Sequence, residues 1–318
     1  MAIARAQVAL NLIPWVNLKA PPGGEPVWLL SDPAWRLQQA EVHRQIRRSG
    51  FDAVMIEVLD TQTLQNYRRM LDDTGLRPAP GFLQISPPEA KGLSLPRGSA
   101  EWVRWFNTVR RRAEESNFFG LHTVFLAPEL DKQGSRYRRA CAMGADFDQD
   151  LLDRQVECLV EAAEILRAEG IRPGLHNHVG TLIETEFEID YALAQIDAAL
   201  LGVSPDVGHL EWAGIDCVRF LTRYRDRLID LHVKDLDLTI AAASRDRPIP
   251  YEEVADQMFF REPGLGNIDL DGAVAALGDD FAGWLIVEVD KTSMDPFESA
   301  RASWKWVERT FPAVRKER

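Results

Sequence analysis

The stretch RPGLHNHVG, from Arg172 to Gly180, contains a short apolar lead-in, two histidines one residue apart and a closing glycine. A short apolar run bounded by turn residues is typical of a buried strand in a parallel sheet. Side chains alternate along a strand, so His176 and His178 are expected on one side and Asn177 on the other. The stretch therefore predicts a strand that ends in two imidazoles.

Similar segments recur along the whole chain. The candidate strands cover residues 7–15, 52–58, 77–85, 121–127, 172–178, 200–208, 228–235 and 283–289. Between them lie stretches such as 33–50, 64–75, 99–116 and 146–170, whose apolar residues recur at the steps of an amphipathic helix. Ser99 or Asp146 is a candidate helix cap.

This alternation predicts an α/β fold. Strands that alternate with helices imply parallel strands with right-handed crossovers, and eight such units favour a closed (β/α)8 TIM barrel over an open sheet. Strand one runs into PWVNLKAPPGGEP, which lacks the G-x-G-x-x-G turn of a dinucleotide-binding sheet. We expect one domain over residues 1–318, with a long insertion at about 236–267 after strand seven that acts as a lid or a subunit contact.

Composition excludes several classes of protein. The net charge of −12 and the pI near 5.1 argue against a surface that neutralises phosphates, so neither nucleic acid nor an anionic membrane is an expected partner. Cys141, Cys158 and Cys217 form no Cys-x-x-Cys pair, which predicts buried thiols in a reducing compartment. No apolar run is long enough to span a membrane, and we expect a cytoplasmic protein.

The polar residues are judged by their place on the barrel, whose active sites lie at the C-terminal ends of the strands. His43 falls in a helix and His122 at a strand start, so both are interpreted as structural. The last four strands instead end in side chains that bind metals or protons; these are His176, His178, Asp206, His209, His232, Lys234, Glu288 and Asp290. Imidazoles and carboxylates that converge from four strand ends predict a site for a divalent cation.

Five motifs between residues 172 and 290 carry a family resemblance. They are GLHNHVGT, SPDVGHLEWAG, DLHVKD, PGLGNIDL and WLIVEVD, in that order. The chain resembles the xylose-isomerase-like TIM-barrel superfamily of sugar phosphate isomerases and epimerases. Within it the motifs are similar to those of inosose dehydratases, and their spacing to that of dehydroshikimate dehydratases.

The resemblance implies one divalent metal ion held by Glu, Asp, His and Glu, with Mn²⁺ favoured and Mg²⁺, Co²⁺ or Zn²⁺ as alternatives. Asp206, His232 and Glu288 match three of these ligands. At strand five the chain departs from the family glutamate, and either His176 or Glu129 of FLAPEL is the fourth ligand; we favour His176.

The resemblance also implies roles for the remaining residues. His178 falls where the dehydratases place a catalytic base, and His209 is expected to bind substrate. From its residue type and place, Lys234 is expected to be catalytic, by supplying positive charge or donating a proton to the departing group, or else to form a salt bridge to Asp206 or Asp235.

Such a site permits abstraction of a proton next to a carbonyl, because a metal ion stabilises the developing charge while a histidine accepts the proton. We expect a keto sugar, keto-polyol or keto-glycoside as substrate, with Glu57, Trp15 and Asn17 lining its site, unless Trp15 plugs the barrel floor instead. Elimination would make the chain a dehydratase or lyase, and reprotonation an isomerase or epimerase; we favour elimination.

The chain also resembles the catalytic subunit of C-glycoside deglycosidases, which works with a small partner, and the insertion and the proline-rich loop after strand one would suit an aglycone pocket or a partner contact. We expect an oligomer, with a small partner subunit as one option. A non-catalytic binding protein on a decayed barrel is the remote alternative. An apurinic endonuclease is disfavoured, because the chain has only six histidines and a net charge of −12.

Overall fold

Short parallel strands form the centre of the molecule. The computed structural model describes residues 3–18, 27–29, 32 and 34–311. Each of the predicted strand segments contains a strand: β1 Val8–Leu10, β4 Ala53–Met55, β5 Arg77–Ala79 with β6 Phe82–Gln84, β7 Thr123–Ala127, β8 Arg172–Leu175, β9 Gly202–Val203, β10 Leu231–Val233 and β13 Leu285–Val287.

These strands close into a barrel in two halves. One half has the order β10-β13-β1-β4-β5 and the other β6-β7-β8-β9, and the neighbouring strands are parallel. β5 and β6 belong to one predicted strand that is interrupted at residues 80–81, and the opposite seam is joined by the bridges Val203–Leu228 and Asp206–His232. The prediction of a TIM barrel is confirmed.

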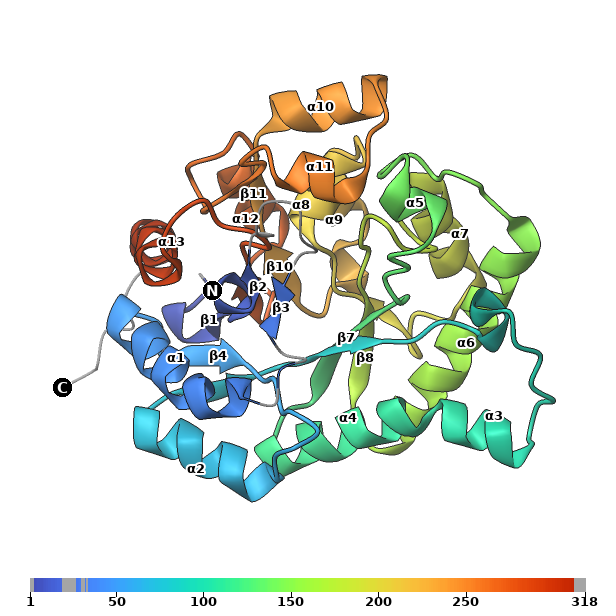
Figure 1. Ribbon diagram of the computed structural model, residues 1–318, viewed down its shortest axis with the longest axis horizontal. Coiled ribbons are helices and arrows are strands. Elements are labelled where there is room, and N and C mark those ends of the chain that lie inside the picture. The colour runs from blue at the N-terminus through green and yellow to red at the C-terminus, as the bar shows by residue number, and fades with distance from the viewer. Residues whose placement is uncertain (1–2, 19–26, 30–31, 33, 312–318) are drawn as a thin grey trace.

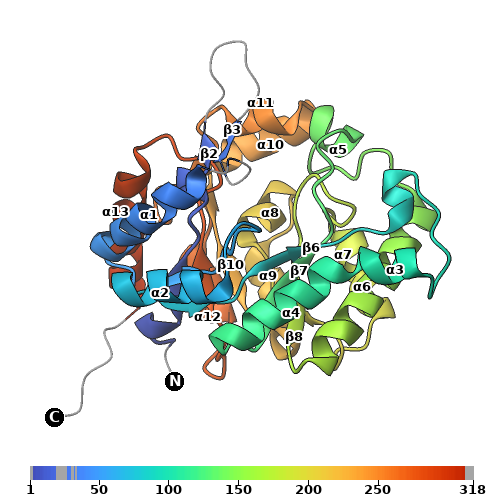
Figure 2. The same cartoon turned by 60° about the horizontal axis from the view of Figure 1, so that its bottom comes forward.

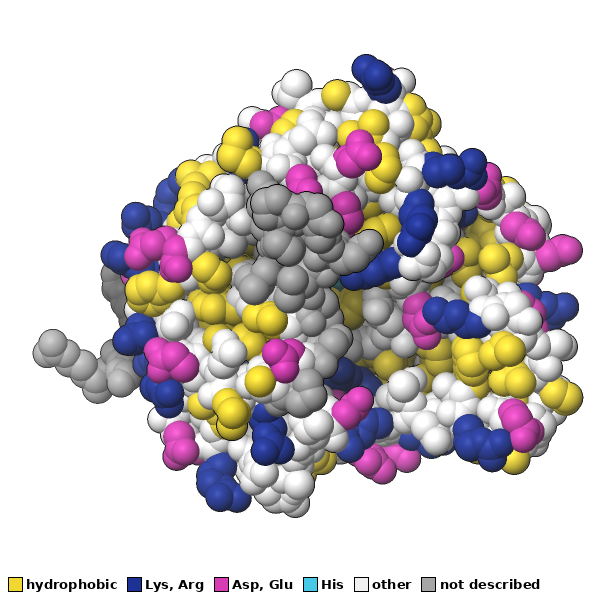
Figure 3. All heavy atoms as spheres, in the orientation of Figure 1, with side chains coloured by type: hydrophobic (Ala, Val, Ile, Leu, Met, Phe, Trp, Pro, Cys, Tyr) yellow, Lys and Arg dark blue, Asp and Glu magenta, His cyan; other side chains and the backbone are white. Residues whose placement is uncertain are grey.

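Helices surround the strands (Figures 1 and 2). They are α1 Trp35–Ser49, α2 Leu64–Thr74, α3 Ala100–Trp105, α4 Asn107–Phe119, α5 Ser135–Arg138, α6 Gln149–Ala168, α7 Glu186–Gln195, α8 Val207–Trp212, α9 Cys217–Arg223, α10 Leu238–Asp246, α11 Tyr251–Ala255, α12 Leu270–Ala276 and α13 Pro296–Thr310. In the described part of the chain no helix has the length and hydropathy needed to cross a membrane. On the face shown in Figure 3, side chains of both charges are interspersed.

Two local predictions are corrected. The helix expected over 99–116 is two helices, because the chain bends at Phe106 and buries that ring completely. Ser99 caps α3 as predicted, since its hydroxyl accepts from the Trp102 N–H at 3.1 Å. Asp146 caps no helix: α6 is capped by Asp148, and Asp146 instead pairs with Arg139 at 2.6 Å.

The long insertion after the seventh barrel strand is ordered and returns to the barrel. It contains α10 and α11, and its end is fastened by an antiparallel pair of β11 Asp235–Leu236 with β12 Phe260–Arg261. Tyr251 of α11 stacks on Tyr137 of α5, with ring centroids 4.9 Å apart and planes 10° apart. Lys291 adds ion pairs to Glu252 at 3.2 Å and Asp256 at 2.8 Å. These contacts hold α11 above the carboxyl ends of the strands.

The buried carboxylate of Asp235 organises the segment that follows β12. It accepts backbone N–H bonds from Gly264, Gly266 and Ile268 at 2.8, 2.9 and 3.1 Å. A Cβ at Gly266 would lie 2.2 Å from Asp235 Oδ1, so only glycine fits against this carboxylate. The aspartate of LHVKD therefore shapes the loop that carries PGLGN.

The two histidines outside the strand ends, His43 and His122, do not line the cavity at the strand ends. His122 is exposed just before β7. His43 is completely buried in α1, its ring contacts Tyr67 edge-on at 5.6 Å, and neither ring nitrogen has a hydrogen-bond partner among the described residues. Burial lowers the pKa of His43 to about 4.

Burial of neutral His43 makes the protein less stable at acidic pH. Its folded pKa is depressed, so the unfolded chain binds the proton more readily and stability falls as pH drops through 6.5 towards 4. Between pH 7.5 and 5.5, we expect the free energy of unfolding of His43→Leu to fall by about 1 kcal/mol less than that of wild type. Urea unfolding at both pH values measures this; equal losses in the two proteins would refute it.

Asp235→Asn should lower the free energy of unfolding by about 2 kcal/mol, because an amide cannot accept all of the backbone N–H bonds that the carboxylate accepts. The control is Asp237→Asn on the same segment. Asp237 caps α10, a role that asparagine also fills, so this variant should remain as stable as wild type. Equal stability of the two variants in urea would contradict the assigned role of Asp235.

Candidate functional site

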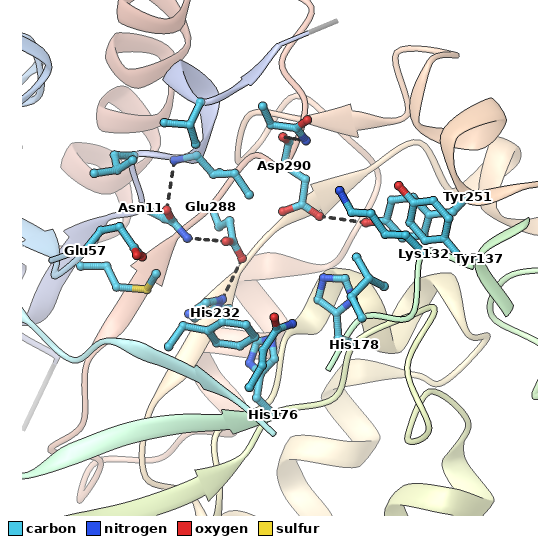
Figure 4. A pocket seen from close by; sticks show the side chains of 18 of the residues that line it. Asn11, Glu57, Lys132, Tyr137, His176, His178, His232, Tyr251, Glu288 and Asp290 are labelled. Atoms are coloured by element: carbon cyan, nitrogen blue, oxygen red, sulfur yellow. Dashed lines mark hydrogen bonds and ion pairs between the residues drawn. The ribbon is translucent and has the colours of Figure 1, made fainter. Parts of the chain in front are cut away.

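A cavity of about 380 Å³ opens at the C-terminal ends of the barrel strands (Figure 4). Its wall combines polar side chains from the strand ends with aromatic ones from α5 and α11. The lining residues are Asn11, Leu12, Ile13, Val16, Asn17, Met55, Glu57, Phe82, Gln84, Leu130, Lys132, Tyr137, His176, His178, His232, Tyr251, Glu252, Glu288 and Asp290. A cavity of this size with a few converging polar groups is typical of a small-molecule site.

The Nε2 atom of His176 is available as a metal ligand or hydrogen-bond acceptor. Its Nδ1 lies 3.1 Å from the Ser204 carbonyl oxygen, which can only accept, so Nδ1 carries the proton and Nε2 keeps its lone pair. Burial and the neighbouring His232 hold the pKa of His176 well below its usual value. This is the arrangement in which metal-binding histidines are held by an outer hydrogen bond.

Asp206 uses its two carboxylate oxygens differently. Oδ1 accepts the His209 N–H at 3.0 Å and so caps α8, while the backbone N–H of Asp206 donates to Asn177 Oδ1 at 3.0 Å. Oδ2 faces His232 Nδ1 at 3.7 Å. The helix cap thereby fixes the carboxylate with one oxygen turned to the other strand ends.

Glu288 and His232 form a close pair between β13 and β10. Glu288 Oε2 lies 2.7 Å from His232 Nδ1, and Glu288 Oε1 accepts from the Asn11 amide. The Asn11 Oδ1 accepts the Ile13 N–H at 3.0 Å, which fixes the amide with its nitrogen towards Glu288. Although burial opposes it, the charges of Glu288 and Asp206 raise the pKa of His232 to about 9.

These residues fit a divalent cation. One ligand atom from each of His176, Asp206 and His232 lies within 4.8 Å of the other two, and Glu288 contacts His232. Two imidazoles and two carboxylates are a donor set for a borderline or hard divalent ion. The cluster is almost completely buried, so uncompensated carboxylates here would be costly.

Lys234 supplies positive charge behind the cluster. Its buried ammonium lies 3.0 Å from Asp206, 2.7 Å from Asp290 and 3.3 Å from Glu288. Although burial opposes each charge, these ion pairs raise the pKa of Lys234 and hold that of Asp206 well below its usual range. Lys234 does not line the cavity, and the salt bridge to Asp206 that its sequence position suggested is present.

His178 lies beside this cluster as a neutral acceptor. Its Nδ1–H donates to the Val179 carbonyl at 2.7 Å, which leaves the Nε2 lone pair free. Burial and the charge of Lys234 lower the pKa of His178 to about 4. His209 lies behind it, with ring centroids 3.8 Å apart, and does not line the cavity.

A second group of metal-type side chains, His178, His209 and Asp290, also meets the distance limit of 4.8 Å. Lys234 Nζ already contacts two of its members, at 3.0 Å from His209 Nε2 and 2.7 Å from Asp290 Oδ1. Because Lys234 also contacts Asp206 and Glu288, the same ammonium compensates carboxylates of both groups.

Of the remaining predicted site residues, two line the cavity and two do not. Glu57 and Asn17 line the cavity. Trp15 does not: its indole N–H donates to Gln45 of α1 at 2.8 Å, because the turn after β1 directs the ring against that helix. Glu129 lies apart from His176, in a smaller pocket where it pairs with Lys91 at 2.6 Å.

Several cavity residues were missed in the sequence. Asn11 and Gln84 follow or end strands β1 and β6, so their position at a strand end was a usable signal. Lys132 and Tyr137 come from the segment after β7, and no local pattern points to them, whereas Tyr251 belongs to the aromatic-containing insertion that was expected to act as a lid or a subunit contact.

A closed parallel barrel with imidazoles and carboxylates converging at the C-terminal strand ends defines a class of metal-binding (β/α)8 enzymes. A family model described as xylose isomerase-like TIM barrel matches residues 44–310, and the chain belongs to this family. The inosose dehydratase of Geobacillus kaustophilus (strain HTA426) is 26% identical over 322 residues, which cover 95% of this chain and 94% of that protein.

Solved structures share the fold. The IolI protein with a bound zinc atom has a TM-score of 0.63 at 15% identity and covers 96% of this chain and 99% of its own. The 3-keto-D-glucoside 4-epimerase YcjR of E. coli has a TM-score of 0.63 at 15% identity and covers 95% and 99%. The predicted family is confirmed, as is the prediction of an enzyme, since the relatives are named as a dehydratase and an epimerase.

The geometry separates the two candidates for the fourth metal ligand. His176→Ala should weaken metal binding more than about 100-fold, because even outer-sphere partners are worth 10- to 100-fold. Glu129→Ala should leave binding unchanged, because Glu129 pairs with Lys91 in another pocket. Titration calorimetry with Mn²⁺ and Zn²⁺ measures both variants; a loss confined to Glu129→Ala would reverse the assignment.

Proposed function

We propose that the chain is a divalent-metal-dependent dehydratase or lyase that acts on a cyclic keto sugar or keto-polyol. The observation that carries this proposal is the neutral, acceptor-ready His178 beside the His176, Asp206, His232 and Glu288 cluster, in one cavity. The inosose dehydratase relative supports a keto-inositol as the first substrate to test.

His178 removes the proton next to the carbonyl. Its Nδ1–H is held by the Val179 carbonyl, so Nε2 is the atom that accepts. The Nε2 lone pair is the acceptor that a general base requires.

The four proposed metal ligands are His176, Asp206, His232 and Glu288. A divalent ion held by them supplies Lewis-acid chemistry that lowers the cost of negative charge on a carbonyl oxygen. Asn11 holds one oxygen of Glu288, and the Ser204 carbonyl holds the His176 ring, so both side chains are oriented before any ligand binds.

The other cavity residues orient the substrate. The side-chain amides of Asn17 and Gln84 form hydrogen bonds with substrate hydroxyls. Tyr137 and Tyr251 provide an aromatic wall on the side of α5 and α11. Lys234 and His209 act from behind the wall through Asp290 and His178. Their roles are therefore electrostatic and positional.

The aromatic wall favours a substrate whose sugar ring carries an apolar or aromatic substituent, as in the keto-glycoside of a C-glycoside deglycosidase. Epimerisation by reprotonation of the same intermediate is the second candidate, and the structural likeness to a 3-keto-glucoside epimerase favours it. We further propose Mn²⁺ as the ion, a single domain over 1–318, an oligomer for which a small partner subunit is one option, and a cytoplasmic location.

The test combines metal analysis with solvent-deuterium exchange into a keto-inositol and 3-keto-glucose. Asp206→Ala should lose the metal, because it removes a central ligand. His178→Ala should keep the metal but lose exchange by about 100-fold or more, since a general base is worth 10²- to 10⁴-fold. Wild type without stoichiometric metal would overturn the proposal and favour a binding protein.

A further inference from the structure

The cavity contains one carboxylate that the described contacts leave uncommitted. Of its four acidic side chains, Glu288 pairs with His232, Asp290 with Lys234, and Glu252 with Lys291. For the fourth, Glu57, no hydrogen bond or ion pair of the carboxylate is found with the other described residues. Its side chain lines the cavity at the end of β4.

Both backbone polar groups of Glu57 are hydrogen-bonded to buried side chains. Its N–H donates to the Tyr67 hydroxyl at 3.1 Å, and its carbonyl accepts from the Gln39 amide at 2.8 Å. Gln39 in turn accepts from Gln62 at 2.7 Å, and all three supporting side chains are buried. Buried polar groups are costly unless paired, and these pair with one another and with the backbone of Glu57, so the network fixes the position of this cavity residue.

Glu57 faces the metal-type cluster from the side opposite His178. Figure 4 places Glu57 and His178 on either side of the Glu288–His232 pair. The topology agrees, because β4 and β8 belong to different halves of the barrel and β5, β6 and β7 lie between them. A substrate centred on the cluster would therefore present one carbon to His178 and a neighbouring part to Glu57.

We propose that Glu57 is the general acid that protonates the departing group in the elimination, a role that rests on the proposed function. His178 takes the proton from the carbon next to the carbonyl, and the electron pair moves into an enediolate. As the carbon–carbon double bond forms, the bond from the β-carbon to the hydroxyl breaks, and that oxygen takes the Glu57 proton and leaves as water. Solvent then returns the proton from His178 to Glu57.

Burial supports this assignment. It raises the pKa of Glu57, although the charge of Arg112 opposes the shift. A carboxyl group with a raised pKa holds its proton closer to neutral pH, which suits an acid.

Glu57→Gln tests the role with a keto-inositol as the probe. The variant should retain wild-type metal content and thermal stability, and it should still exchange the α-proton with deuterium because His178 is intact. Elimination to the unsaturated ketone should fall by about 100-fold or more, since a general acid is worth 10²- to 10⁴-fold. A keto-inositol with fluorine in place of the β-hydroxyl should restore elimination, because fluoride leaves without a proton.

Two further variants guard the interpretation. Glu129→Gln changes a carboxylate that lies in another pocket and pairs with Lys91, and it should leave the ratio of elimination to exchange unchanged. Glu57→Asp, which retains the acid but withdraws it by one carbon, serves if Glu57→Gln does not fold and should lower elimination while exchange persists. Unchanged elimination in Glu57→Gln, or an equal loss of exchange and elimination, would overturn the role of Glu57. Absence of exchange in wild type would instead overturn the proposed function.

Discussion

The site depends on one buried cation. Lys234 lies within 3.3 Å of three carboxylates that come from two strand ends, and none of these groups has appreciable access to water. Bringing Asp206, Glu288 and Asp290 together without it would add the desolvation cost of each charge to their mutual repulsion. The ammonium offsets both terms, and its side chain does not line the cavity.

The barrel places this cluster by simple alternation. His232 and Lys234 are two residues apart at the end of β10, and Glu288 and Asp290 are two apart at the end of β13. Each pair therefore leans to the same side of its strand, and the parallel pairing of β10 with β13 brings the two pairs together. Two short strands thus supply four residues of the charge cluster, and Asp206, which follows β9, joins them through Lys234.

Period-two alternation is also why so much was predictable from sequence. The strand ends that carry His176, Asp206, His232 and Glu288 were found because parallel strands all end at one face. The side on which Trp15 lies was not predictable, because the turn after β1 sets its direction and no repeating pattern governs a turn. The Tyr137–Tyr251 stack joins segments 114 residues apart, and such contacts have no local sequence signal.

The amide of Asn11 bonds a carboxylate 277 residues further along the chain. β1 also pairs with β13, so the first and last strands of the barrel meet at the proposed metal ligands. During synthesis the imidazoles and Asp206 emerge well before Glu288, and Asn11 emerges before all of them. The ligand set is therefore completed only when the barrel closes, so a nascent or truncated chain that lacks β13 has no finished metal site.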